Sequence, residues 1–219
     1  MTTATASPLP KDAPYSNGAD TESGVHKIIT WDEYTTDGAI YGRRYDIVEG
    51  VRRFMSSPIF RHQLVSGNVF ALLRADERRC NGRAVFAPCD VLIRRTPRLQ
   101  VRQPDLLFVA NDRVRQQPGY ETTGYLAVAP NLVVEILFDS DRKSVVAARR
   151  ADYFAIGVDE VWIIQPEEQT ATVLSQGVTA YTEIARYTPA DTLVSVALPA
   201  LVAPVSDFFD GLAPVVGVV

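Results

Sequence analysis

Cysteine is scarce in this chain of 219 residues. Cys80 and Cys89 are the only two, they form no CxxC pair, and no secretory leader precedes them, so we expect neither a disulfide scaffold nor a zinc site. Long apolar runs are also missing, because none reaches the ~18–20 residues that span a bilayer. The N-terminus lacks the apolar core of a signal peptide. These absences predict a cytoplasmic protein.

Lysine is missing from one whole segment of the chain. From Arg43 to Arg102 there are 13 Arg, no Lys and five acids, a net charge of +8, so the other residues carry −12 and the whole chain −4. That overall acidity argues against a protein that coats nucleic acid, but a local basic surface can still steer DNA. The planar guanidinium group suits bidentate contact with phosphate. The segment predicts either a DNA-binding surface, with Arg94, Arg95 and Arg98 as candidates, or a solvated arginine-rich face.

The composition is that of a soluble globular protein, with 47% hydrophobic and 22% charged residues. Residues 1–25 contain few large apolar groups and predict a flexible leader before a single domain over 26–219. We expect a short capped helix at 30–36 and long helices at 57–79 and 142–156, the last ended by Gly157. Strands are expected at 45–54, 84–88, 90–95, 101–110, 132–137, 158–166, 170–176 and 178–184. This order predicts an α/β or α+β fold with a mixed central sheet.

Two apolar strands each carry one inward acid. Alternation places Asp105 on the same face as Leu107, and Glu135 on the same face as Val133. Asp90 begins a third such strand. Buried carboxylates that converge repel one another unless a cation lies between them, and their hard oxygen atoms suit Mg²⁺ or Mn²⁺. The alternative is that each acid pairs with one of the many arginines.

A cation and a histidine lie on helix stripes that face the core. Arg149 shares its stripe with Val145 and Tyr153, so it points toward the acids. It could stabilise the transition state of metal-dependent phosphodiester hydrolysis, or form a structural salt bridge to Glu135, and spacing alone favours neither. His62 lies on the apolar stripe of the first long helix, where it is either a satisfied core residue or a catalytic group.

Several segments, in order and with suitable gaps, resemble a known family. They are YDIVEG followed by RHQLV, APCDVLI leading into QPDLLFV, then APNLVVEIL and YFAIGVDEVWIIQPE. From about Trp31 to Phe209 the chain resembles the restriction-endonuclease family often called Uma-two, within the PD-(D/E)xK nuclease superfamily. The resemblance implies an α-β-β-β-α-β core, with a mixed sheet flanked by helices and extra C-terminal strands. It also implies a DNA endonuclease that uses Mg²⁺, with Mn²⁺ as a substitute.

The resemblance assigns roles to particular residues. Pro104 and Asp105 match the PD of the family motif, and Glu135 matches its second acid. The family's lysine, on the next helix four residues before the tyrosine, is Arg149 here. Arginine stays protonated and cannot act as a base, but it can stabilise negative charge while a metal activates the attacking water.

Three further polar residues match family positions near the site: His62, Asp46 and Asp90. The predicted catalytic residues are Asp105, Glu135, Arg149 and His62, and the predicted metal ligands are Asp105, Glu135 and Asp90, with Asp46 nearby. Cutting both strands of DNA would favour a homodimer. Two other functions remain open: a nucleic-acid-binding relative that no longer cuts, and a structural or interaction protein whose acids are held in salt bridges.

Overall fold

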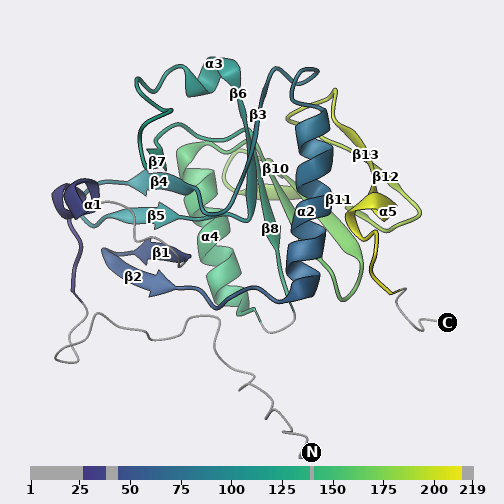
Figure 1. Cartoon of the computed structure of the whole chain (residues 1–219), viewed down its shortest axis with the longest axis horizontal. Coiled ribbons are helices and arrows are strands. Elements are labelled where there is room, and N and C mark those ends of the chain that lie inside the picture. The colour runs from purple at the N-terminus through teal and green to yellow at the C-terminus, as the bar shows by residue number, and fades with distance from the viewer. Residues whose placement is uncertain (1–26, 38–43, 139–140, 214–219) are drawn as a thin grey trace, which may run out of the picture.

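The computed structural model describes residues 27–37, 44–138 and 141–213 (Figure 1). The leader expected over 1–25 lies outside these residues, and the single domain over 26–219 remains a prediction. The helices are α1 (Trp31–Asp37), α2 (Phe60–Ala75), α3 (Asn111–Val114), α4 (Lys143–Ile156) and α5 (Val205–Phe208). The strands are β1 (Tyr45–Val48), β2 (Val51–Phe54), β3 (Gly82–Phe86), β4 (Asp90–Arg94), β5 (Gln100–Arg102), β6 (Leu106–Ala110), β7 (Tyr125–Leu126), β8 (Leu132–Ile136), β9 (Glu160–Gln165), β10 (Thr170–Gln176), β11 (Tyr181–Tyr187), β12 (Thr192–Val194) and β13 (Val202–Pro204).

Most of the described strands belong to two sheets. The larger sheet has six strands in the order β11-β10-β9-β8-β6-β3, and β8 and β9 run parallel while the other neighbours run antiparallel. The smaller sheet has five strands in the order β2-β1-β5-β4-β7, and β12 pairs only with β13. The larger sheet is therefore mixed, as the sequence predicts.

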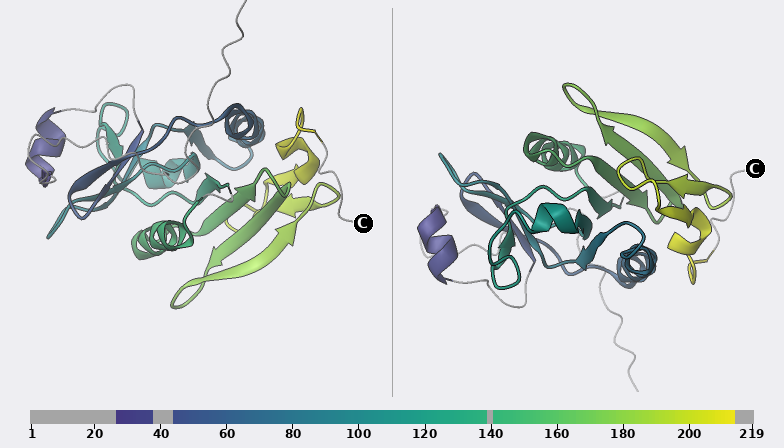
Figure 2. Two further views of the ribbon diagram at one scale, coloured as in Figure 1. Left: turned by 90° about the horizontal axis from the view of Figure 1, so that it is seen from below. Right: turned by 90° about the horizontal axis from the view of Figure 1, so that it is seen from above.

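The two long helices cover opposite faces of the six-stranded sheet (Figure 2). The face that carries Leu106 and Val134 packs against α2 and, farther along, against α5. The other face, with Leu107 and Val133, packs against α4 and against β4 of the smaller sheet. Successive residues of a strand point to opposite sides, so one pair of strands supplies both cores.

The order α2-β3-β6-β8-α4-β9 confirms the predicted α-β-β-β-α-β core within a mixed α+β fold. Strands β4, β5 and β7 and the short helix α3 are inserted between these elements, and β10 to β13 follow them. None of the helices in the described residues is long and apolar enough to cross a membrane.

Local sequence signals place the helix ends. Thr30 and Glu33 form the reciprocal pair of a capping box at α1: the Glu33 amide donates to Thr30 Oγ1 at 3.2 Å and the Thr30 amide donates to Glu33 Oε2 at 2.9 Å. Helix α4 ends at Gly157, whose φ of 85° is the left-handed conformation that glycine adopts without strain. Helix α2 spans Phe60–Ala75, so the predicted start at residue 57, before Pro58, is wrong.

The single strand expected at 101–110 is wrong, because the chain forms two strands there. Strand β5 ends at Arg102 in the smaller sheet and β6 begins at Leu106 in the larger one. Residues Gln103, Pro104 and Asp105 carry the chain from one sheet to the other. Pro104 has no backbone N–H to donate, which suits a position between ladders. The crossing brings polar groups of both sheets together beside α4.

Candidate active site

Asp105, the residue just before β6, lies opposite Glu135 of the neighbouring strand β8. The antiparallel register pairs Leu106 with Val134, so the next pair along is Asp105 with Glu135. Both residues are buried, with 5% and 2% of their surface exposed. The backbone N–H of Ile136 donates to Asp105 Oδ2 at 2.8 Å. Like charges directly opposite in a sheet are destabilising, so this pair needs cations.

Asp105 is held by a ring of donors. Arg44, just before β1, donates from Nη1 to Asp105 Oδ1 at 2.6 Å, and His62 Nε2 lies 3.2 Å from the same oxygen. Burial alone would raise the pKa of Asp105, but the hydrogen bond with His62, the Arg44 guanidinium and the Ile136 amide outweigh it and hold that pKa well below its usual range. Asp105 is therefore a carboxylate at neutral pH.

Glu135 faces helix α4. Arg149 donates from Nη1 to Glu135 Oε2 at 2.7 Å, and the Tyr153 hydroxyl donates to Oε1 at 2.5 Å. Burial raises the pKa of Glu135 above its ordinary value despite Arg149, and the charge of Asp105 raises it further. The salt bridge between Arg149 and Glu135 that the helix stripe allowed is present. It explains how an acid is accommodated in a buried strand.

Asp46 joins the smaller sheet to this cluster. It is fully buried on β1, where Arg102 Nη1 donates to its Oδ2 at 2.8 Å and Arg149 Nη2 lies 3.1 Å from the same oxygen. Arg149 thus bridges Asp46 and Glu135. Burial opposes ionisation of Asp46, but Arg149, Arg102 and the Gln103 amide more than offset it and lower its pKa.

Asp90 lies apart from the facing acids. It is at the start of β4, in the smaller sheet, and its carboxylate accepts hydrogen bonds from the Tyr34 hydroxyl at 2.6 Å and from Gln103 Nε2 at 2.5 Å. Burial raises its pKa, although both of these hydrogen bonds lower it. Among the described residues, no three His, Cys, Asp or Glu side chains are grouped to hold a metal ion. Asp90 therefore does not join Asp105 and Glu135 in such a group.

His62 occupies the first turn of α2. Its side chain is mostly buried and its ring stacks on that of Phe138, with centroids 6.0 Å apart. Its Nδ1 is buried and has no hydrogen-bond partner among the described residues. A buried polar atom without a partner is uncommon in a purely structural setting. Contact with Asp105 places His62 at the facing acids rather than in the apolar core alone.

The arginines expected on a DNA surface lie at the far end of the β4–β5 hairpin. Arg94 pairs with Glu49, and the Arg95 guanidinium lies 4.3 Å from the centre of the Trp31 ring. Arg98 lines a cavity of about 410 Å³ beside Trp31. Arg98 and Gln103 are five positions apart along an extended chain, roughly 16 Å at ~3.3 Å per residue. The hairpin tip is therefore well away from Asp105.

Sequence reasoning missed several members of the cluster. The sequence shows Arg44 and Arg102 only as part of an arginine-rich segment, and it predicts a continuous strand through Gln103. It places Tyr153 on the correct stripe but indicates no partner for it. One signal was available for it: Tyr153 is four residues after Arg149, so both reach the same spot on the sheet.

The donor chemistry at the facing acids fits a magnesium ion. Mg²⁺ is usually bound through one or two carboxylates, with water and substrate phosphate completing its coordination. Asp105 and Glu135 supply two buried carboxylates that repel each other, and a divalent cation would relieve that repulsion. At present Arg44, His62, Arg149 and Tyr153 contact their oxygens.

The fold has the α-β-β-β-α-β core that characterises the restriction-endonuclease-like class. A family model described as "Uma2: Putative restriction endonuclease" matches residues 33–206, so the chain belongs to that family. Among solved structures it is similar to one titled as a "putative nuclease belonging to DUF820" from Anabaena variabilis, with a TM-score of 0.67. The two are 18% identical over 83% of this chain and 97% of that chain, a likeness that shows the fold. Comparison with curated proteins gave no match.

Proposed function

We propose that this protein is a metal-dependent DNA endonuclease that hydrolyses phosphodiester bonds. The observation that carries the proposal is the pair of buried acids, Asp105 and Glu135, facing each other across two strands with arginines around them. Family membership supports a nuclease, and nucleases of the restriction-endonuclease-like class generally use divalent metals. In this proposal Asp105 and Glu135 hold Mg²⁺, and Asp90 positions Gln103 from the neighbouring sheet.

The metal would supply an activated water and neutralise charge on the phosphate. The chain's own groups complete the chemistry. Arg149, fixed between Asp46 and Glu135, keeps a permanent positive charge where negative charge develops on the phosphate oxygens. Asp46 acts through Arg149, because its carboxylate orients the guanidinium. Arg149 cannot accept a proton, so proton transfer must use another group.

Cleavage of supercoiled plasmid tests the proposal. The protein should convert plasmid to nicked or linear DNA in Mg²⁺ or Mn²⁺ and should leave it intact in EDTA. Cleavage that persists in EDTA would contradict the metal-dependent mechanism, and a protein that binds DNA but never cuts would favour the second function below.

His62 is the group best placed to move a proton or contact the scissile phosphate. Its Nε2 lies beside Asp105 and its Nδ1 is otherwise without a partner among the described residues. Replacing His62 by Gln should lower turnover by roughly 10²-fold or more, with the melting temperature nearly unchanged. Both quantities should be measured on one preparation. A variant that is less stable but fully active per folded molecule would make His62 a core residue.

The β4–β5 hairpin should carry part of any DNA affinity. Neutralising Arg94, Arg95 and Arg98 together should weaken binding and flatten the slope of log K against log salt by up to about 2.7, since each phosphate contact contributes roughly 0.9. Fluorescence anisotropy of a labelled duplex over a series of salt concentrations measures this slope.

The control for this experiment neutralises three arginines outside the 43–102 segment: Arg113, Arg115 and Arg186. If this control flattens the slope as much as the hairpin variant does, the effect reflects net charge and the hairpin has no particular role. A hairpin variant with an unchanged slope would mean that its arginines only solvate the surface.

A second function is a DNA-binding relative that no longer cuts. The observation in its favour is that both facing acids are already neutralised by arginines, Arg44 on Asp105 and Arg149 on Glu135. Such a protein would bind DNA with the salt dependence described above but would show no metal-dependent cleavage.

For the endonuclease, cutting both strands would need two active sites, so we also propose a homodimer. Light scattering with and without DNA would test this.

A further inference from the structure

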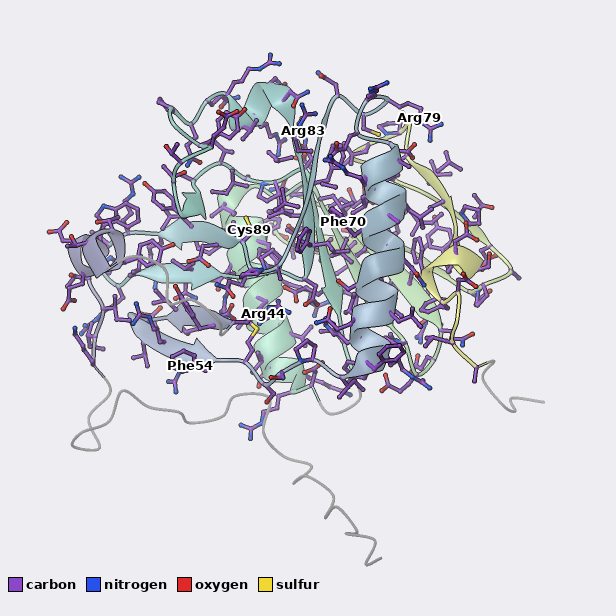
Figure 3. The ribbon with its side chains drawn as sticks, in the orientation of Figure 1. Arg44, Phe54, Phe70, Arg79, Arg83 and Cys89 are labelled. Carbon is purple, nitrogen blue, oxygen red and sulfur yellow. The ribbon has the colours of Figure 1, made fainter. Side chains whose placement is uncertain are left out.

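We infer that Arg44 is a resident counter-ion that a metal must displace from Asp105, so that the guanidinium and the divalent cation exclude each other. This inference rests on the proposed metal site at Asp105 and Glu135. We call this competition between the Arg44 guanidinium and the metal ion for Asp105 the gate. Figure 3 labels Arg44 at the junction between the smaller sheet and helix α4.

The charge balance of the cluster is the first argument. Three carboxylates, Asp46, Asp105 and Glu135, are in contact with three guanidinium groups, Arg44, Arg102 and Arg149, and Arg102 also pairs with Asp152. A divalent ion would add two positive charges beside these three guanidinium groups. Repulsion between unit charges a few ångströms apart is strong in a partly buried site. Metal binding is therefore favoured if one arginine leaves.

Of the three arginines in the cluster, Arg44 would lose the fewest contacts if it left. The Arg102 side chain is 2% exposed and pairs with two acids, Asp46 and Asp152, and Arg149 is 12% exposed and also pairs with two acids. Arg44 is 19% exposed and, within the part of the chain that the structure describes, pairs with Asp105 alone, with one further bond to the backbone carbonyl of Gln103 at 2.9 Å. Its Nε is buried without a hydrogen-bond partner among the described residues.

The position of the contact is the third argument. Asp105 Oδ2 accepts a hydrogen bond from the backbone amide of Ile136, whereas Oδ1 is contacted by the side chains of Arg44 and His62, which lie outside the sheet. Oδ1 is therefore the oxygen that an arriving ion would meet. Arg44 Nη1 lies 2.6 Å from it, and a magnesium ion would need to come within about 2.1 Å of the same atom. The released guanidinium would then be free to contact a phosphate.

Calorimetric titration of Mn²⁺ into the DNA-free protein tests this inference without relying on cleavage. Arg44→Gln removes the competitor and should tighten Mn²⁺ binding at least tenfold relative to the wild type. Arg44→Lys keeps a positive charge at the same place and should stay within threefold. Arg113→Gln, which breaks a half-exposed ion pair with Asp159 elsewhere, should also leave the affinity unchanged.

Thermal melting shows whether each variant is folded, and Arg44→Met, which keeps the apolar stem, replaces Arg44→Gln if that variant does not fold. Unchanged or weaker Mn²⁺ affinity in the neutral variants, beside measurable binding in the wild type, would overturn the gate and leave the proposed metal site standing. If neither the wild type nor the neutral variants bind Mn²⁺, the gate and the metal site both fail.

Discussion

Replacing Arg149 by Met should lower the free energy of unfolding by about 3–5 kcal/mol, the usual cost of removing one partner of a buried ion pair. The side chain of Arg149 contacts two acids that are almost wholly buried, Asp46 and Glu135. Methionine keeps the apolar stem and removes only the charged head. Urea unfolding of the variant and the wild type at neutral pH measures the difference.

The same loss should depend on pH. The folded-state pKa of Glu135 is already raised by burial and by Asp105, and losing Arg149 should raise it further. A group with a raised folded-state pKa destabilises the protein as pH rises through that value, and its protonation restores stability below it. The gap between variant and wild type should therefore be full at neutral pH and shrink as the pH falls.

Arg149→Lys is the matched control, because it keeps the cation and installs the residue type usual in the family at this position. It should recover most of the stability. A Met variant within about 1 kcal/mol of the wild type would show that Asp46 and Glu135 do not depend on Arg149, since that is the range of ordinary surface ion pairs.

Asp105→Asn and Glu135→Gln should each lower the rate of DNA cleavage by about 10³-fold or more. Each change removes one of the two proposed carboxylate ligands and much of the electrostatic contribution that a bound metal would make, a loss of about 4 kcal/mol in transition-state stabilisation. Single-turnover cleavage at saturating protein separates this loss from weaker DNA binding.

Asp159→Asn is the control for these substitutions. Asp159 forms a partly exposed ion pair with Arg113 and lies outside the cluster, so its loss should leave the rate within a few-fold of the wild type. If the Glu135→Gln variant cuts DNA at the normal rate and melts as the wild type does, Glu135 is not part of the site. It would then be only a structural partner of Arg149.

Patterns among residues close together in the sequence predict the fold well. A two-residue period places Asp105 and Glu135 on faces that prove to be the same face of one sheet, and a helical stripe turns Arg149 toward them. The capping pair at Thr30 and the glycine after α4 mark helix ends as expected. Each of these signals depends on neighbours along the chain, so one sequence is enough to detect it.

What could not be predicted depends on contacts between distant residues. Asp46 and Arg149 are about a hundred positions apart in the sequence. They meet because β1 of the smaller sheet lies beside helix α4, which covers one face of the larger sheet. The break at Gln103 is hard to detect in the sequence because only three residues separate the end of β5 at Arg102 from the start of β6 at Leu106. Asp90 has the same local pattern as Asp105, yet pairing with β5 and β7 places it in the other sheet.

Calorimetric titration of Mn²⁺ into the wild type and into Asp105→Asn tests the metal site most directly, since it needs neither DNA nor turnover. The wild type should bind Mn²⁺, and Asp105→Asn should remain folded but bind at least tenfold more weakly, a loss of about 1.4 kcal/mol. Equal Mn²⁺ affinity in the two folded proteins would contradict the site at Asp105 and Glu135, and would leave their arginine pairs as purely structural salt bridges.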